Sequence, residues 1–220
     1  MKTILCYGDS NTWGVDPEIQ SPSPLYSVVR IPYGRRWPNV LEQKLGEGYH
    51  VIEDGINGRT AGVDDPCLNY RNGLKTLHPA LLAHAPLDLI VIMLGENDTK
   101  QRIGLKARDI VKGHEQMVGA VRGANCGPEG GACEILLVAP PVTGPDYAPS
   151  YEEGFGYGRE TSLRLPATLQ KVAGVLQCHY FDCNSVAANS PIDGVHLDKD
   201  AHRALGEGLA EYIRSNIYND

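Results

Sequence analysis

Short apolar segments alternate with longer amphipathic segments along the whole chain, and this alternation limits the fold more than any other feature. The apolar segments are apolar on both faces, as strands of a covered parallel sheet are, and they span residues 4–7, 51–53, 87–94, 134–139 and 179–181. Apolar residues recur at helical spacing over residues 36–45, 107–122, 163–176 and 200–217. The pattern predicts an α/β fold, a doubly wound three-layer α/β/α sandwich with a five-stranded parallel sheet.

Length and composition are typical of one globular domain. A chain of 220 residues with 42% hydrophobic and 21% charged residues can bury a full core, so we expect residues 1–220 to form a single domain. The net charge of -7 and the scattered basic residues argue against nucleic acid as a partner.

Several features of the sequence bear on the cellular location of the protein. No apolar run approaches the roughly 20 residues of a membrane span, and the first residues do not resemble a targeting signal, so we expect a cytoplasmic location and no membrane partner. That location favours free thiols for the six cysteines. Cys126 and Cys133, which flank a Gly-rich turn, are the only pair we consider for a disulfide.

Four short polar motifs follow predicted strands or precede the last predicted helix. They are Gly-Asp-Ser at 8–10, Gly-Ile-Asn-Gly at 55–58, Gly-Glu-Asn-Asp at 95–98 and Asp-Gly-Val-His at 193–196. Because parallel strands end at the same edge of a sheet, the topology is expected to gather these motifs there. The less regular stretches 17–32 and 140–158 are candidates for loops that frame a pocket.

The motifs supply a nucleophile and a base. Ser10 lies where a strand turns into a helix, and the partial positive charge of a helix N-terminus favours a developing anion there. Asp193 and His196 are close enough in the chain for the carboxylate to orient the imidazole as a base for Ser10. Taken alone, Ser10 could merely cap the helix, and Asp193 with His196 could be a surface pair.

Other residues of the motifs can donate hydrogen bonds to a reacting group or shape the loops. The Asn97 amide and the Gly58 N–H could stabilise a tetrahedral oxyanion. Alternatively, Asn97 could only form an Asx turn, and Gly58 could be only a turn glycine. Asp9 and Asp98 are expected to shape the loops through hydrogen bonds. The other six histidines are expected mostly at the surface or at interfaces: His50, His78, His84, His114, His179 and His202. No metal site is expected, because the usual Cys and His ligand spacings are missing.

The four ordered motifs resemble those of the SGNH, or GDSL, hydrolase superfamily, and the resemblance covers nearly the whole chain. It implies a flavodoxin-like sandwich and a triad of Ser10, Asp193 and His196. It further implies an oxyanion hole made by Ser10, Gly58 and Asn97. The segments 8–14, 51–55, 58–60 and 95–100 are similar to the bacterial arylesterase and acyltransferase branch, whose members tend to form homo-oligomers. Asn11 replaces the apolar residue that is common after the serine.

Together these features predict a serine carboxylic-ester hydrolase without a cofactor. We expect it to act on small, short-chain, acetyl-like esters through an acyl-enzyme, with transfer to an alcohol as a variant. Trp13 and the loops 55–63 and 140–158 are expected to wall the acyl group. A carbohydrate acetyl esterase, a thioesterase or lysophospholipase, and a non-enzymatic flavodoxin-like binding module are the alternatives. The aromatic residues available for sugar stacking do not decide among them: Trp13, Trp37, Tyr147, Tyr151 and Tyr157.

Overall fold

A five-stranded parallel sheet forms the centre of the protein. The computed structural model describes residues 1–20, 28–148, 151 and 154–218. The strand order is β4-β1-β5-β6-β7, and every neighbouring pair is parallel. This confirms the predicted α/β fold. The strands are β1 (Lys2–Gly8), β4 (Tyr49–Gly55), β5 (Leu89–Met93), β6 (Glu134–Ala139) and β7 (His179–Asp182).

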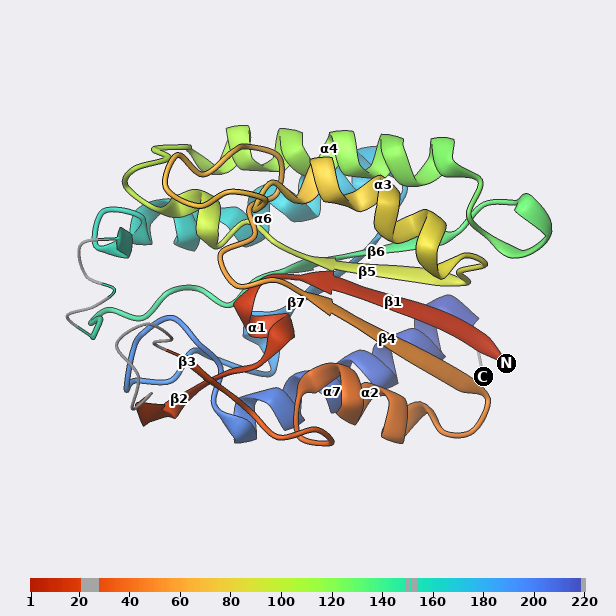
Figure 1. Ribbon diagram of the computed structural model, residues 1–220, viewed down its shortest axis with the longest axis horizontal. Helices are drawn as coiled ribbons and strands as arrows, with labels where there is room; N and C mark the ends of the chain where they lie inside the picture. The colour runs from red at the N-terminus through yellow and green to blue at the C-terminus, as the bar shows by residue number, and fades with distance from the viewer. Residues whose placement is uncertain (21–27, 149–150, 152–153, 219–220) are drawn as a thin grey trace.

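Helices cover both faces of the sheet, as Figure 1 shows. One layer holds α3 (Gly73–His84), α4 (Ala107–Ala124) and α6 (Arg159–Leu176); the other holds α2 (Trp37–Leu45) and α7 (Lys199–Ile213). Side chains alternate along each strand, so Leu5 and Tyr7 join the first hydrophobic core while Ile4 and Cys6 join the second. A short π-helix, Arg214–Tyr218, follows α7. The three-layer arrangement is therefore the predicted one.

Helix α3 is an element that the sequence pattern did not indicate. It starts with Gly73 and contains Pro79, two residue types that disfavour a helix interior. Its stability comes from outside the helix, because Leu77 and Leu81 are fully buried in the core. The Asn72 side chain also caps the first turn by accepting from the Lys75 N–H at 3.3 Å.

The stretch 17–32, predicted as loop, is partly a β-hairpin. Strands β2 (Val15–Gln20) and β3 (Val28–Arg30) pair antiparallel, and residues 21–27 of the stretch lie outside the described residues. The hairpin lies beside the carboxyl end of the sheet, next to helix α1 (Ser10–Trp13) (Figure 1).

The strand order reverses beside β1, and this places the candidate site. The chain goes from β1 to β4 on one side and then to β5 on the other. Gly8, the last residue of β1, is paired with Gly55 and with Met93. Ligands of doubly wound sheets bind at such a point. Gly8 also permits α1 to fold back over the strand end, because a Cβ there would lie 2.0 Å from Thr12 Oγ1.

Two of the six histidines that were expected mostly at the surface or at interfaces lie in the interior instead. His114 and His202 are fully buried, and burial lowers their pKa values to about 4 and about 3. His202 Nδ1 accepts a hydrogen bond from the Trp37 N–H at 3.1 Å, which joins α7 to α2. The prediction of free thiols is confirmed: all six cysteines are unbridged, Cys126 and Cys133 included. No helix in the described part of the chain is long and apolar enough to cross a membrane.

We expect His202 to make the protein less stable in acid. Its folded pKa lies below the unfolded value of about 6.5, so its stabilising contribution is present above that pH and is lost as the pH falls toward the folded pKa. His202→Gln, whose amide oxygen can still accept from Trp37, should therefore lose less unfolding free energy on acidification than the wild type. Urea denaturation at several pH values measures this. The exposed His78→Gln should behave as wild type, and equal acid sensitivity of His202→Gln and wild type would contradict the expectation.

Candidate active site

Ser10 lies at the turn from β1 into α1. Asp9 caps the helix by accepting from the Asn11 N–H at 3.0 Å, and Gly14 ends it in the left-handed region. Ser10 is 6% exposed, and its surface faces a cavity. The helix has only four residues, so its dipole is weak. Activation of the hydroxyl must come from a neighbouring base.

That base is in place in the loop before α7. His196 Nε2 lies 3.1 Å from Ser10 Oγ, and His196 Nδ1 lies 2.7 Å from Asp193 Oδ2. Asp193 Oδ1 accepts from the N–H groups of Val195 and His196 at 2.9 and 2.8 Å. Burial raises the pKa of Asp193, but the hydrogen bonds and charge of His196 and these N–H groups outweigh it and lower the pKa. The carboxylate is therefore ionised at neutral pH and can orient the imidazole.

Three residues that line the cavity carry hydrogen-bond donors suited to an oxyanion. The donors are the N–H of Ser10, the N–H of Gly58 and the side-chain amide of Asn97, which lies in the 3-10 helix η1 (Asn97–Thr99). Gly58 has φ +81°, a conformation that favours glycine. Within the described residues, neither backbone N–H has a hydrogen-bond partner. Unpaired donors that face a cavity are suited to bind a developing oxyanion.

The Asn97 amide is held in place from two sides. Its Nδ2 lies 3.2 Å from Asp9 Oδ2 and 3.1 Å from the carbonyl oxygen of Arg59. Asp98 accepts the Ala61 N–H with both carboxylate oxygens, at 3.1 and 2.9 Å. Asp9 and Asp98 thus shape the loops as predicted. Burial raises the pKa of Asp9 to about 6 and that of Asp98 to about 7.

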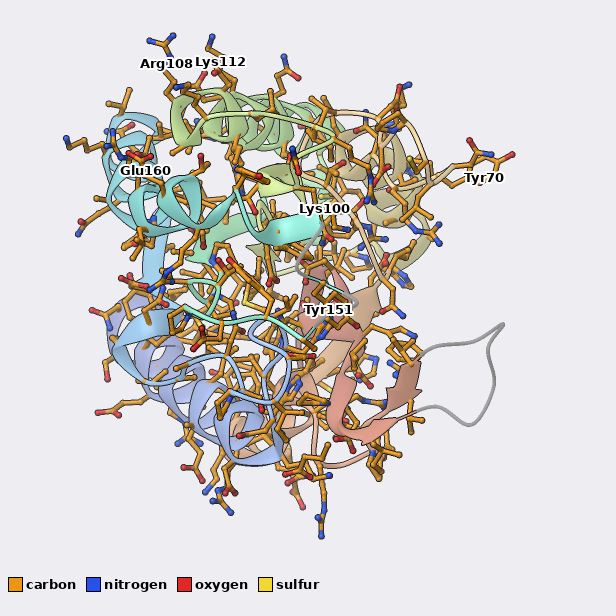
Figure 2. The ribbon with its side chains drawn as sticks, turned by 90° about the vertical axis from the view of Figure 1, so that its left-hand side faces the viewer. Tyr70, Lys100, Arg108, Lys112, Tyr151 and Glu160 are labelled. Carbon is orange, nitrogen blue, oxygen red and sulfur yellow. The ribbon has the colours of Figure 1, made fainter. Side chains whose placement is uncertain are left out.

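The cavity has a volume of about 440 Å³ and both predicted loops contribute to it. Asn57 and Gly58 come from the first loop, and Tyr151 and Phe155 from the second. The Tyr151 ring lies edge-on to the His196 imidazole with 5.4 Å between the ring centroids. Figure 2 labels Tyr151 on the face of the molecule that carries the site. The remaining walls are largely apolar, with Val15, Val28, Leu68 and Val195.

Two tryptophans do not occupy the positions that the sequence interpretation gave them. Trp13 does not line the cavity; its ring lies against the Arg30 guanidinium, 4.9 Å from its centre. A substrate-binding role for Trp13 is therefore not supported. Trp37 is fully buried in the core between α2 and α7 and cannot stack on a sugar. Of the five aromatic residues considered for stacking, Tyr151 is the one that lines this cavity.

Asn11, which departs from the family pattern, faces the interior. Its Nδ2 donates to Glu96 Oε2 at 2.7 Å and to the Val195 carbonyl at 3.3 Å, and its Oδ1 accepts from the Leu197 N–H at 2.9 Å. Burial is the main cause that raises the pKa of Glu96. Asn11 therefore fastens the serine turn to the loop that carries His196. This role was not predicted from the sequence, although two polar residues were a signal for it: Asn11 next to the first motif and Glu96 inside the third.

Arg59 joins the strand ends beneath the site. Its Nη1 donates to the carbonyl oxygens of Gly8 and Asp54 at 2.9 and 2.6 Å, and its Nη2 to Asp54 Oδ1 at 2.7 Å. The guanidinium centre lies 3.9 Å from the Tyr7 ring centroid, within the range of a cation–π contact. The ends of β1 and β4 are thereby fixed to each other and to the loop that presents Gly58.

Comparison with known proteins identifies the family. A search of curated proteins gives no match. Among solved structures, Est24, a carbohydrate acetylesterase from Sinorhizobium meliloti, is 36% identical with a TM-score of 0.91, covering 98% of this chain and 99% of that one. A second carbohydrate acetylesterase family member from Sinorhizobium meliloti is 43% identical with a TM-score of 0.88, covering 98% of each chain.

An aryl esterase from M. smegmatis is similar to the same degree as Est24. It is 36% identical with a TM-score of 0.91, covering 98% of this chain and 99% of that one. Residues 6–204 match the family described as GDSL-like lipase/acylhydrolase, a range that includes all four motifs. The chain belongs to the GDSL-like lipase/acylhydrolase family.

Proposed function

We propose that the protein is a serine esterase that hydrolyses small carboxylic esters with short, acetyl-like acyl groups. The observation that carries the proposal is the hydrogen-bonded series Ser10–His196–Asp193, which ends at the cavity beside the two unpaired N–H groups. The family match and the esterases among the similar structures support the same reaction. A flavodoxin-like binding module for a phosphate ligand would leave this hydrogen-bonded series without a purpose.

In the proposed acylation step, Ser10 Oγ attacks the ester carbonyl while its proton moves to His196 Nε2. Asp193 holds the imidazole through Nδ1 and stabilises the imidazolium that forms. The carbonyl oxygen becomes an oxyanion, which the N–H groups of Ser10 and Gly58 and the Asn97 amide stabilise. Because the Asn97 amide already contacts Asp9 and the Arg59 carbonyl, the oxyanion must compete for one of its hydrogens. Collapse of the intermediate expels the alcohol, which takes the proton from His196.

Water completes the reaction in the proposed second step. His196 removes a proton from the water as it attacks the acyl-enzyme, and the same donors stabilise the second oxyanion. An alcohol in the place of water would give acyl transfer. Neither step needs a cofactor. A carbohydrate acetyl ester would react by the same chemistry, and the two acetylesterases named above favour it as the second candidate substrate.

Two further properties belong to the proposal. A cytoplasmic location is supported by the six free thiols. Assembly into a homo-oligomer is supported by large apolar side chains that are exposed, among them Leu68, which lines the cavity and is 37% exposed, and Ile192 at 56% exposure. Cell fractionation measures the location, and a native mass measurement gives the oligomeric state.

Ser10→Ala should abolish ester hydrolysis and labelling by a fluorophosphonate probe. The fold should be kept, because the serine hydroxyl contributes little to packing. Intact-mass detection of the probe adduct together with circular dichroism checks both parts. Ser185→Ala, at an exposed position, serves as the matched control and should label as wild type does. Hydrolysis by a folded Ser10→Ala protein at near wild-type rates would exclude the assignment.

Asn97→Ala should lower kcat by about a hundredfold or more, which is the effect of losing one oxyanion donor. KM should change much less, because the contact strengthens only in the transition state. Steady-state kinetics on an acetyl ester measures the changes in kcat and KM separately. Asn69→Ala, an exposed asparagine in the loop beside the cavity, is the control. A rise in KM with kcat unchanged would assign Asn97 to ground-state binding instead.

Among soluble esters of one alcohol, kcat/KM should be highest for acetyl to butyryl groups and should fall by octanoyl. The cavity is small, and Pro140, Pro141 and Pro145 restrict the backbone of one framing loop. An open apolar groove would instead gain about 0.8 kcal/mol for each buried methylene. A steady rise through octanoyl to dodecanoyl would therefore favour the thioesterase or lysophospholipase alternative.

A further inference from the structure

Lys100 is a buried cation in the wall of the active-site cavity. It directly follows η1, three residues after Asn97, and it lines the same cavity as Ser10 and His196. The residue is only 8% exposed. In Figure 2, Lys100 lies above Tyr151 on the same face of the molecule, and both residues line this cavity.

The ammonium group of Lys100 has no hydrogen bond and no ion pair with any residue that the structure describes. Among the described residues it makes one cation–π contact, with the Phe155 ring, whose centroid lies 5.2 Å from Nζ. Lysine is rarely this buried unless it is paired. The acids around it are partly paired elsewhere: Asp65 binds Arg102 at 2.6 Å, and Glu96 accepts from Asn11 through Oε2 at 2.7 Å, whereas Glu96 Oε1 has no hydrogen-bond partner among the described residues. Burial is the main cause that lowers the pKa of Lys100.

A second cation shares the cavity wall. The Arg71 side chain is fixed by its Nε on the Asn57 carbonyl at 2.7 Å and by its Nη1 on the Asn69 carbonyl at 2.9 Å. Among the described residues that line the cavity there is no aspartate or glutamate. The protein as a whole has a net charge of -7, so the described part of the cavity wall has the opposite charge balance to the chain. A cavity of this kind favours an anionic ligand.

We propose that Lys100 is a specificity-determining residue, and that the preferred ester carries a carboxylate that binds its ammonium group. The inference rests on the proposed esterase function and names the substrate class of that site. A carboxylate supplies the charge-assisted hydrogen bond that Lys100 does not form with any described residue. The Phe155 ring restricts the direction of the side chain, so little rotamer entropy is lost on binding. Arg71, which also lines the cavity, adds a favourable field.

Two pairs of esters locate the carboxylate on the acyl half or the alcohol half. For the acyl half, 4-nitrophenyl hemisuccinate is compared with the uncharged 4-nitrophenyl valerate; for the alcohol half, 4-acetoxybenzoate is compared with its methyl ester. The readout is the ratio of kcat/KM between the charged and the uncharged ester of each pair. In Lys100→Met this ratio should fall by about tenfold or more for at least one pair, relative to wild type. The difference in intrinsic reactivity between the two esters of a pair cancels, because the same ratio is compared between the variant and the wild type.

Matched variants separate charge from packing. Lys100→Arg should keep most of the preference, since it keeps the charge. Lys106→Met, an exposed lysine outside the cavity, should leave both ratios as in wild type. If Lys100→Met does not fold, the wild-type ratio is measured at low and high salt, where screening should lower it for a charged pair. A ratio that is unmoved by salt then overturns the inference.

The failure of the inference differs from the failure of the proposed function. If Ser10 is labelled by the probe and the uncharged esters are hydrolysed, but Lys100→Met leaves both ratios unchanged, Lys100 only balances the buried acids Asp9 and Glu96, and the inference is wrong. If wild type hydrolyses no ester of either pair and Ser10 is not labelled, the proposed function fails, and the inference fails with it.

Discussion

Parallel pairing of β1 with β4 on one side and β5 on the other decides where Ser10, Gly58 and Asn97 lie. The register brings Gly8, Gly55 and Met93 to one line across the sheet, and the chain leaves this line in three separate turns. One turn carries Ser10, the second Gly58 and the third Asn97. The Arg59 guanidinium binds the carbonyl oxygens at the ends of β1 and β4, so the turns start from a rigid base.

The parts of the structure that follow from local pattern could be predicted from the sequence. The strands around Leu5, Val91 and Leu137 are apolar on both faces. The motifs lie at one edge of the sheet, because parallel strands end at the same edge. Helix α3 could not be predicted in this way, because Gly73 and Pro79 oppose a helix and burial of Leu77 and Leu81 overcomes them.

Side-chain placement was predicted less well than the fold. Nothing in the sequence distinguishes the buried His202 from the exposed His78, because the packing of α2 on α7 decides it. Trp13 follows Ser10 closely in the chain, yet its ring lies against Arg30 rather than in the cavity. The position of Lys100 in the cavity wall depends likewise on contacts between distant segments, such as that with Phe155.

The hydrogen bond between Ser10 and His196 joins residues 186 positions apart. The serine begins α1, two residues after the end of the central strand β1, whereas Asp193 and His196 belong to the segment that leads into helix α7. Proteins open locally in cooperative units, and α7 with its preceding loop can form a unit of that kind. Partial detachment of this unit would separate base from nucleophile while the sheet stays folded. The Asn11 contacts with Val195 and Leu197 oppose such opening, so amide exchange in residues 193–197 reports on enzymatic competence rather than on global stability.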